Sequence, residues 1–203
     1  MKTKNERKIS KKLVTTFLAT VTLMAATVAP ALAAPKVRIV DDVGYGGSGC
    51  PDRSASVTVS PDGQELTILF DEFIADAAKR KHRRKSCNLS IPIEVPQGFQ
   101  ISLYDADYRG YIAPLTTARL RAEYFFAGQR GPVFSRTFKG ETEYFVRDPL
   151  ESVANIWSRC GDSLNMRVNA AMTARGKGMA TVDSFDLAHR GLKYHIKYRS
   201  CNK

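Results

Sequence analysis

Apolar side chains recur at every second position through most of this chain, and that period constrains the fold more than any other feature. It is clearest at residues 89–95, 120–126 and 164–170. Alternation of this kind places successive side chains on opposite faces of a β-strand. No window shows an apolar stripe at helical spacing longer than about two turns. The sequence therefore predicts about ten strands, each burying one face.

Turn residues separate the predicted strands. Pro61-Asp62-Gly63 lies between alternating stretches at 55–59 and 66–70, which predicts a β-hairpin. Pro96-Gln97-Gly98 marks a second turn. Clean alternation in antiparallel strands favours two stacked sheets. We therefore predict an all-β fold, an antiparallel β-sandwich, for which a jelly roll is one arrangement that the pattern allows.

Three short stretches depart from the simple alternation. Residues 73–81 favour a short helix or a helical loop. Pro92 lies inside an alternating stretch, and because proline lacks the N–H that a central strand donates, its strand is expected at a sheet edge or with a bulge. Gly44–Gly49 holds four glycines in six residues. This composition predicts a short flexible segment leading into Cys50.

The first 33 residues have the three parts of an export signal. Residues 1–12 hold six lysines or arginines against one glutamate, residues 13–32 hold no charge, and Ala31-Leu32-Ala33 is a small-x-small cleavage site. A membrane anchor is the alternative, since about 20 apolar residues can span a bilayer, but five threonines and Pro30 weaken it. We therefore expect a cleaved signal peptide at 1–33, a single secreted domain at 34–203 and no membrane span in the mature chain. Cleavage removes a net five positive charges and lowers the formal charge from +11 to +6.

Export to an oxidising compartment makes disulfides the favoured role of the four cysteines, Cys50, Cys87, Cys160 and Cys201. They include no C-x-x-C pair, so neither a zinc site nor a redox dithiol has its usual spacing. Three pairings are open. We favour Cys50–Cys87 with Cys160–Cys201, because each bridge closes a local loop of about 40 residues and would constrain the unfolded chain by about 4 kcal/mol.

The sharpest local charge feature is the run from Lys79 to Lys85. It carries six formal positive charges in seven residues, which equals the whole excess of the mature chain, so the rest of the domain sums close to neutral. A solvated loop, a processing site, and attachment to an anionic polysaccharide or envelope surface are the three interpretations. No aromatic residue interleaves the charges, so no specific nucleic-acid partner is predicted. The candidate binding residues are Lys79, Arg80, Lys81, Arg83, Arg84 and Lys85.

Signatures of catalysis are scarce. The histidines are His82, His189 and His195, and neither G-x-S-x-G nor H-E-x-x-H occurs. Asp105 and Asp107 are weak candidates for calcium ligands, because alternate aspartates in a loop supply oxygen donors, although aspartate is also common in turns. We predict no cofactor and no other metal site. The acid pairs that a glycosidase mechanism would need are Asp71 with Glu72, Asp105 with Asp107, and Asp183 with Asp186.

Short motifs follow one another in a recognisable order along almost the whole mature chain. They are Gly49-Cys50-Pro51, Phe70-x-x-Phe73, Cys87, Pro96-x-Gly98, Tyr108-Arg109-Gly110, Trp157-x-x-Cys160-Gly161 and Arg199-Ser200-Cys201. In order and spacing they resemble a family of secreted proteins, domain of unknown function 4360. The resemblance implies export, a compact β fold and a two-disulfide frame, and it carries no activity. We interpret Tyr108-Arg109-Gly110 and Trp157 as structural, with Gly110 as a turn glycine near the sheet ends.

These observations predict a secreted protein that binds rather than catalyses, with a glycan or an anionic envelope component held by the basic loop. One alternative is a polysaccharide hydrolase that uses a carboxylate pair. Another is a structural or assembly protein whose exposed edge strands pair between copies. A flat basic face on the folded protein would favour a polyanion binder. A deep polar cleft would favour an enzyme, and an open apolar edge would favour assembly between copies. The sequence does not specify the oligomeric state.

Overall fold

The computed structural model describes most of the predicted mature domain. The described residues are 37–61, 63, 65–102, 105–126, 130–149, 157–161, 163–187 and 198–201. The chain divides into two compact units, residues 1–33 and 34–203, and every described residue belongs to the second. The predicted signal peptide, His189 and His195 lie outside the described residues. The signal peptide and its cleavage therefore remain predictions.

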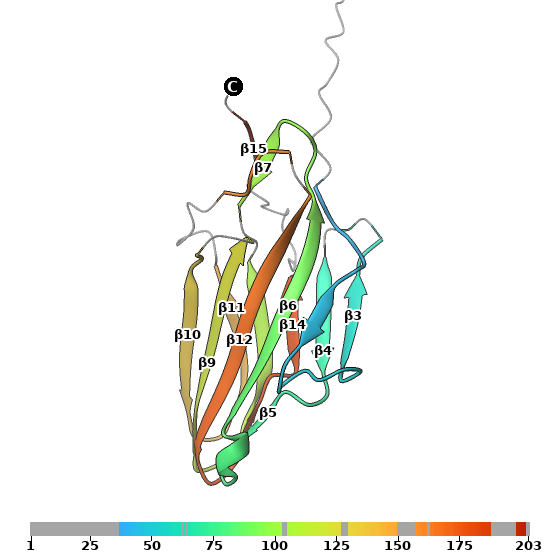
Figure 1. Ribbon diagram of the computed structural model, residues 1–203. Helices are drawn as coiled ribbons and strands as arrows, with labels where there is room; N and C mark the ends of the chain where they lie inside the picture. Colours follow the sequence, from blue (N-terminus) through green and yellow to red (C-terminus); the bar gives the residue numbers. More distant parts are fainter. Residues whose placement is uncertain are drawn as a thin grey trace, which may run out of the picture. The chain divides into compact units, whose positions relative to one another are not determined.

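The first sheet, sheet A, runs in the order β1–β6–β12–β9–β10, with β2 also beside β6 (Figure 1). All of its strand pairs are antiparallel. The long β12 lies between β6 and β9, so its core-facing residues Met166, Val168 and Ala170 have apolar neighbours on both sides. The strand bounds are β1 (Arg38–Ile39), β2 (Gly44–Gly46), β6 (Arg84–Glu94), β9 (Thr116–Phe126), β10 (Val133–Lys139) and β12 (Leu164–Gly176).

The second sheet, sheet B, is also antiparallel and runs in the order β3–β4–β14–β8–β13–β5, with β11 on the other side of β8. The hairpin predicted around Pro61-Asp62-Gly63 is confirmed as β3 paired with β4. The strand bounds are β3 (Ala55–Val59), β4 (Leu66–Phe70), β5 (Ile74–Asp76), β8 (Ala106–Ile112), β11 (Thr142–Asp148), β13 (Met179–Thr181) and β14 (Ser184–Leu187).

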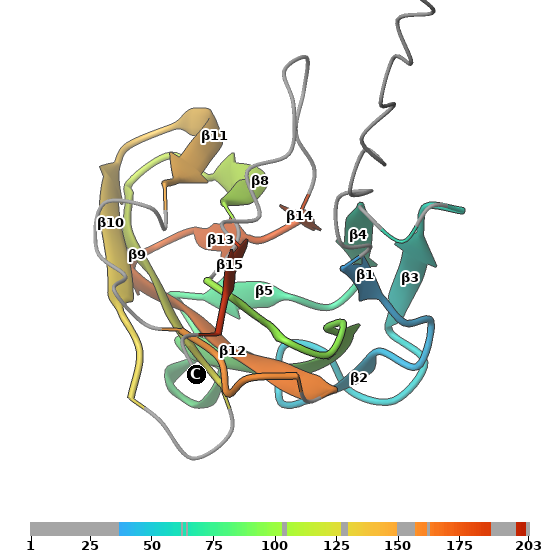
Figure 2. The same cartoon turned by 90° about the horizontal axis from the view of Figure 1, so that it is seen from above.

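The inner faces of the two sheets meet in one hydrophobic core. Sheet A contributes the alternate residues predicted from its sequence, such as Ile91, Leu120 and Val168, and sheet B contributes residues such as Ile68 and Ile112. Seen from above, the sheets form separate layers (Figure 2). The prediction of an antiparallel β-sandwich is confirmed. The described residues form fifteen strands, several of only two or three residues, where about ten were expected.

Both favoured disulfides are confirmed. Cys50 joins Cys87 across a Cα–Cα distance of 5.3 Å, and Cys160 joins Cys201 across 6.0 Å, both within the usual range. The first bridge is fully buried beside β6. The second joins the segment after Trp157 to the end of a small separate sheet, formed by β7 (Phe99–Ile101) and β15 (Tyr198–Ser200).

Local predictions for residues 44–49 and 73–81 were wrong. The stretch 73–81 forms β5 and the start of a 3₁₀ turn at Arg80–His82, because residues 74–76 pair with β13. Gly44–Gly46 is strand β2, and Gly49 packs against the ring of Phe73, where a Cβ would come within 2.5 Å of the ring. The glycines therefore provide close packing rather than flexibility.

Pro92 lies in the interior of β6, which has neighbours on both sides. Its carbonyl accepts a hydrogen bond from the N–H of Val40, so its missing N–H also points towards the β1–β2 side. There Ile39 pairs with Ile93, whereas Gly44 pairs with Ser90, which leaves two extra residues between the short strands. The irregularity that proline requires therefore lies in the β1–β2 segment beside β6 and not in β6 itself.

Candidate functional site

The basic run is not a single loop. Residues 79–83 form an exposed turn that contains the 3₁₀ helix Arg80–His82, and Arg84 and Lys85 begin β6. This turn lies at the end of β6 beside the end of β12 (Figure 1), where the carbonyl of Arg83 accepts a hydrogen bond from the N–H of Ala174. The structure thus places the predicted binding residues at one end of sheet A.

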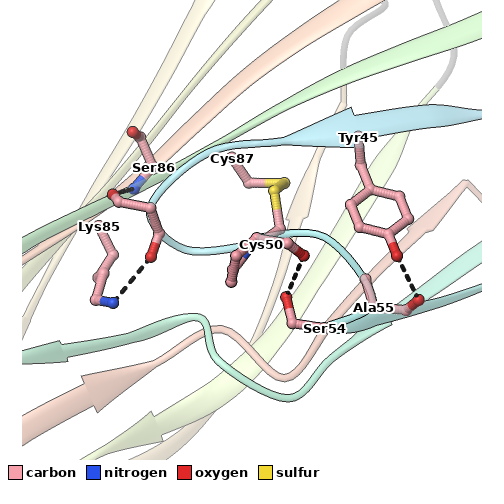
Figure 3. Close-up of a disulfide and its surroundings, with 9 residues drawn as sticks. Tyr45, Cys50, Ser54, Ala55, Lys85, Ser86 and Cys87 are labelled. Atoms are coloured by element: carbon pink, nitrogen blue, oxygen red, sulfur yellow. Dashed lines mark hydrogen bonds between the residues drawn. A yellow bond between two sulfur atoms is a disulfide. The ribbon is translucent and has the colours of Figure 1, made fainter.

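Three contacts hold the run in place. The Nζ of Lys85 donates to the carbonyl of Ser48 at 2.8 Å, next to the Cys50–Cys87 bridge (Figure 3). The Nε of Arg83 donates to the carbonyl of Ala77 at 2.9 Å. Lys79 forms an exposed ion pair with Asp76 at 3.3 Å. These contacts link the run to residues before it in the chain, at Ser48, Asp76 and Ala77.

The outer face of sheet A continues this positive surface. Because side chains alternate along each strand, the residues opposite the apolar core positions point outward. The register aligns Arg84 with Thr173, and Thr173 with Arg119, across three neighbouring strands. Arg175 and Lys139 both lie opposite Thr117. We call the outward cations of this sheet the basic face: Arg84, Arg119, Arg121, Lys139, Arg167 and Arg175.

Contacts within the basic face orient two of its arginines. The Nε of Arg119 donates to the hydroxyl of Ser135 at 2.9 Å. Arg121 forms an ion pair with Glu123 at 3.0 Å. The outward acid at the end of β6, Glu94, is paired with Arg38 at 2.7 Å, and this contact lowers the pKa of Glu94 from its usual value. The acids of this sheet are thus neutralised by arginines of the same sheet.

Charge is segregated between the two sheets. The six strands of sheet A contain nine lysines and arginines and two acids. The seven strands of sheet B contain two arginines and five acids. The sequence showed that residues outside the basic run sum close to neutral, and that sum conceals one sheet with an excess of basic residues and one with an excess of acidic residues. The sequence feature that could have revealed the basic sheet is the set of arginines at 119, 121 and 167, which occupy the polar positions of alternating stretches. That these positions share one face becomes clear only once the strands are paired.

The outer face of sheet B carries a different arrangement. Arg109 of β8 lies opposite Phe145 of β11, and its guanidinium carbon is 5.0 Å from the ring centroid. Tyr111 lies opposite Glu143 in the next outward row. With Asp183, these four residues line a shallow, open depression of about 460 Å³. Phe145 remains 53 % exposed, so an apolar ring is presented to solvent among charged groups.

The structure aligns two acids that come from different predicted pairs. Asp107 and Asp186 lie opposite each other on β8 and β14. Both carboxylate oxygens of Asp107, however, accept hydrogen bonds from Arg147, at 2.9 and 3.1 Å. This pairing engages the oxygens that calcium or an acid–base mechanism would need. Among the described residues, no group of three histidine, cysteine, aspartate or glutamate side chains is arranged to hold a metal ion.

One buried acid was not singled out from the sequence. Asp148 ends β11 on the inward side, and burial raises its pKa from 3.8 to about 6. A hydrogen bond from Tyr124 lowers the pKa, whereas the nearby charge of Asp105 raises it further. Tyr124 also shares a hydrogen bond with Tyr108. These groups lie between the sheets, so we assign them a structural role.

Most of the motif residues support the frame. Gly49, Cys50, Phe73 and Cys87 form one cluster, in which Phe70 packs edge-on against Phe73. A second cluster surrounds the other disulfide. It includes the bond from Gln97 to the carbonyl of Gly161, the bond from the N–H of Cys201 to the carbonyl of Gly98, and the contact of Arg199 with the ring of Trp157.

Gly110 is not a turn glycine, contrary to prediction. It lies within β8, and a Cβ there would come within 2.3 Å of the carbonyl oxygen of Thr181 and 2.6 Å of the hydroxyl of Tyr144. Its absence of a side chain lets Tyr144 donate to that carbonyl at 2.6 Å. In the same motif Tyr108 points into the core and Arg109 points outward.

The fold is a β-sandwich with two disulfides, and disulfides are typical of secreted proteins. The family model described as "Domain of unknown function (DUF4360)" matches residues 35–201, and the chain belongs to this family. A relative from Arthroderma benhamiae (strain ATCC MYA-4681 / CBS 112371), named "Uncharacterized secreted protein", is 35 % identical over 179 residues, which cover 82 % of this chain and 72 % of the relative. The protein is secreted. No helix long and apolar enough to cross a membrane occurs among the described residues.

Similarity to solved structures is weak. The carbohydrate-binding module TmCBM61 in complex with β-1,4-galactotriose shows 10 % identity and a TM-score of 0.35, covering 71 % of this chain and 86 % of its own. CBM28, a carbohydrate-binding module specific for non-crystalline cellulose, shows 12 % identity and a TM-score of 0.33, covering 70 % and 84 %. At these TM-scores no ligand or binding residue can be transferred.

Proposed function

We propose that this secreted protein binds an anionic polysaccharide or a similar polyanion of an envelope or matrix. The ligand lies along the basic face, and the residues of the Lys79–Lys85 run extend the site at one end. The observation that carries the proposal is the segregation of charge, with nine basic and two acidic residues in the strands of sheet A.

The surface suits an extended, repetitive ligand. Strands of a sheet lie about 4.8 Å apart, so outward cations on β6, β12, β9 and β10 form a lattice rather than a pocket. Arg84, Arg119, Lys139, Arg167 and Arg175 are all exposed. Guanidinium groups bind carboxylate and sulfate with paired N–H donors. A polymer that carries regularly spaced acids can therefore contact several arginines at once, and each contact adds avidity.

Sheet B carries an excess of acidic residues, which favours binding of a polyanion to sheet A only. A polyanion is repelled by a surface with an excess of carboxylates and attracted by one with an excess of cations, and this difference acts at a distance of about a Debye length, about 8 Å at physiological salt. The two faces point away from each other, because the core lies between them. The polymer is therefore expected to associate with sheet A alone.

The proposal is tested by affinity electrophoresis of the mature protein in gels that contain polygalacturonate, with dextran as the neutral reference. We expect retardation by polygalacturonate. It should fall steeply as ionic strength rises from about 0.1 M to about 1 M, because the Debye length shortens from about 10 Å to about 3 Å.

Matched variants locate the site. The variant Arg119→Gln/Arg175→Gln removes two charges from the basic face, and Arg53→Gln/Arg159→Gln removes two exposed charges elsewhere. At about 0.7 kcal/mol for each exposed arginine, the first should weaken binding about tenfold, whereas the second should leave it within about twofold. Equal losses in the two variants would show that net charge, not this face, determines binding.

The contribution of the run is tested separately. Replacing Lys79, Arg80, Lys81 and Arg83 by glutamine leaves the strands of sheet A unchanged. Binding that weakens further in combination with the basic-face variant supports one continuous site. Binding that is unaffected by these four replacements removes the turn from the site and leaves the basic face alone.

A further inference from the structure

We infer that the outer face of sheet B holds a second site, which takes a single neutral sugar ring of a glycan in the depression between β8 and β11. The inference does not depend on polyanion binding by sheet A, because the two sites lie on opposite outer faces. The site consists of Arg109, Tyr111, Glu143, Phe145 and Asp183, which line the depression.

Two aromatic side chains form its apolar part. Phe145 and Tyr111 occupy diagonal positions on adjacent antiparallel strands, a spacing of about 7–8 Å that keeps their rings within reach of one ligand. The C–H groups on one face of a pyranose ring form an apolar patch that stacks on an exposed aromatic ring. Stacking of this kind buries apolar area without requiring a deep cavity.

Both rings are held in place before any ligand binds. The guanidinium of Arg109 lies 5.0 Å from the centroid of Phe145. The hydroxyl of Tyr111 donates to Glu141 at 2.8 Å, and this hydrogen bond raises the pKa of Tyr111. Because these contacts restrict the two rings in the free protein, less conformational entropy is lost on binding.

The polar groups around the rings match sugar hydroxyls. Glu143 and Asp183 supply carboxylate acceptors, and Arg109 supplies N–H donors. A sugar hydroxyl can donate a hydrogen bond to a carboxylate and accept one from the guanidinium. Such bonds fix the orientation of the sugar ring on a mostly flat surface. The same arrangement disfavours an acidic sugar, because two carboxylates face one guanidinium. Charge therefore selects a neutral ring here and an acidic polymer on sheet A.

The test uses affinity electrophoresis of the mature protein with three neutral polysaccharides (laminarin, galactomannan and xylan) and with chitosan as a cationic comparison. We expect retardation by at least one neutral polysaccharide, and this retardation should persist at about 1 M salt, where exposed charge interactions are largely screened. Retardation by none of the three, or by chitosan alone, would overturn the inference.

Two variants at apolar residues of similar fractional exposure locate the site. Phe145 and Leu69 are 53 % and 52 % exposed and lie in the same cross-strand row of the outer face, with Ser184 and Arg109 between them. We expect Phe145→Ala to weaken binding of the neutral polysaccharide at least about tenfold, and Leu69→Ala to leave it within about twofold. Equal effects would indicate general adsorption and reject the site.

The two ligand classes are separable within the same experiments. Phe145→Ala should bind polygalacturonate normally, and Arg119→Gln/Arg175→Gln should bind the neutral polysaccharide normally. If polygalacturonate is not bound but the neutral polymer is, sheet A fails as a site and the inference on sheet B stands. If polygalacturonate is bound but the neutral polymer is not, the site on sheet B is rejected and the proposal for sheet A stands.

Discussion

The hydroxyl groups of Tyr108 in β8 and Tyr124 in β9 lie 2.7 Å apart between the two sheets. Both side chains are fully buried, and burial raises the pKa of each phenol. Tyr124 also bonds to Asp148. Since a hydroxyl carries one proton, Tyr124 donates to the ionised carboxylate and Tyr108 donates to Tyr124. A polar chain of three residues thus connects the two sheets across the core.

Removing the hydroxyl of Tyr108, at one end of these hydrogen bonds, should lower the free energy of unfolding less than removing the hydroxyl of Tyr124, in the middle. We expect Tyr108→Phe to lower the free energy of unfolding by about 1–2 kcal/mol, because the oxygen of Tyr124 loses its donor. Tyr124→Phe should cost more, since both Tyr108 and Asp148 lose a partner. Urea denaturation of the two single variants and the double variant gives the coupling energy. Additive effects would show that the hydroxyls do not interact.

The buried Asp148 should make stability depend on pH between about 4 and 6. Its pKa is raised from 3.8 to about 6 by burial, so in this range the folded state binds a proton that the unfolded state has released. The contribution of this group to stability therefore falls as pH rises from 3.8 to about 6, and is constant above. We expect Asp148→Asn to be more stable than the wild type by about 1–3 kcal/mol at pH 7, with the difference vanishing near pH 4. A pH-independent difference would contradict the assignment.

Gly110 should not tolerate a side chain. A Cβ would come within 2.3 Å of the carbonyl oxygen of Thr181, which is backbone and cannot move without disturbing β13. We expect Gly110→Ala to cost about 3 kcal/mol or more, measured as a fall in the denaturation midpoint. Gly46→Ala is the control, because no atom lies within 4 Å of its Cβ position, and its effect should stay within about 1 kcal/mol. Similar costs for both would contradict the steric argument.

The two disulfides should differ in their effect on stability. Their sequence separations, 37 and 41 residues, imply nearly the same loop-closure contribution of about 4 kcal/mol. Cys50 and Cys87 are fully buried, so Cys50→Ala/Cys87→Ala also leaves a cavity in the core, and it should cost more than Cys160→Ala/Cys201→Ala. Calorimetry of both double variants measures the difference. A larger loss for the second pair would contradict this ranking.

The alternating pattern predicted the sandwich, the β3–β4 hairpin and the core faces of β9 and β12, because side-chain period is a local property of the strand. The cysteine pairing was also predictable, since each bridge closes a local loop. The local predictions for residues 44–49, for residues 73–81 and for Gly110 were wrong. In each case the conformation follows from a partner distant in sequence, such as β13 for residues 74–76 or Tyr144 for Gly110.

The sequence alone therefore determined the fold class, the disulfide frame, the concentration of charge at Lys79–Lys85 and the secreted class of the protein. It could not assemble either candidate site. Arg84 and Arg119 become near neighbours only because β12, which is distant in sequence from both β6 and β9, inserts between those strands. Arg109 meets Phe145 only through the pairing of β8 with β11. Alternation says which side chains point outward, whereas the order of strands, set by burial of the core, decides which outward side chains share a face.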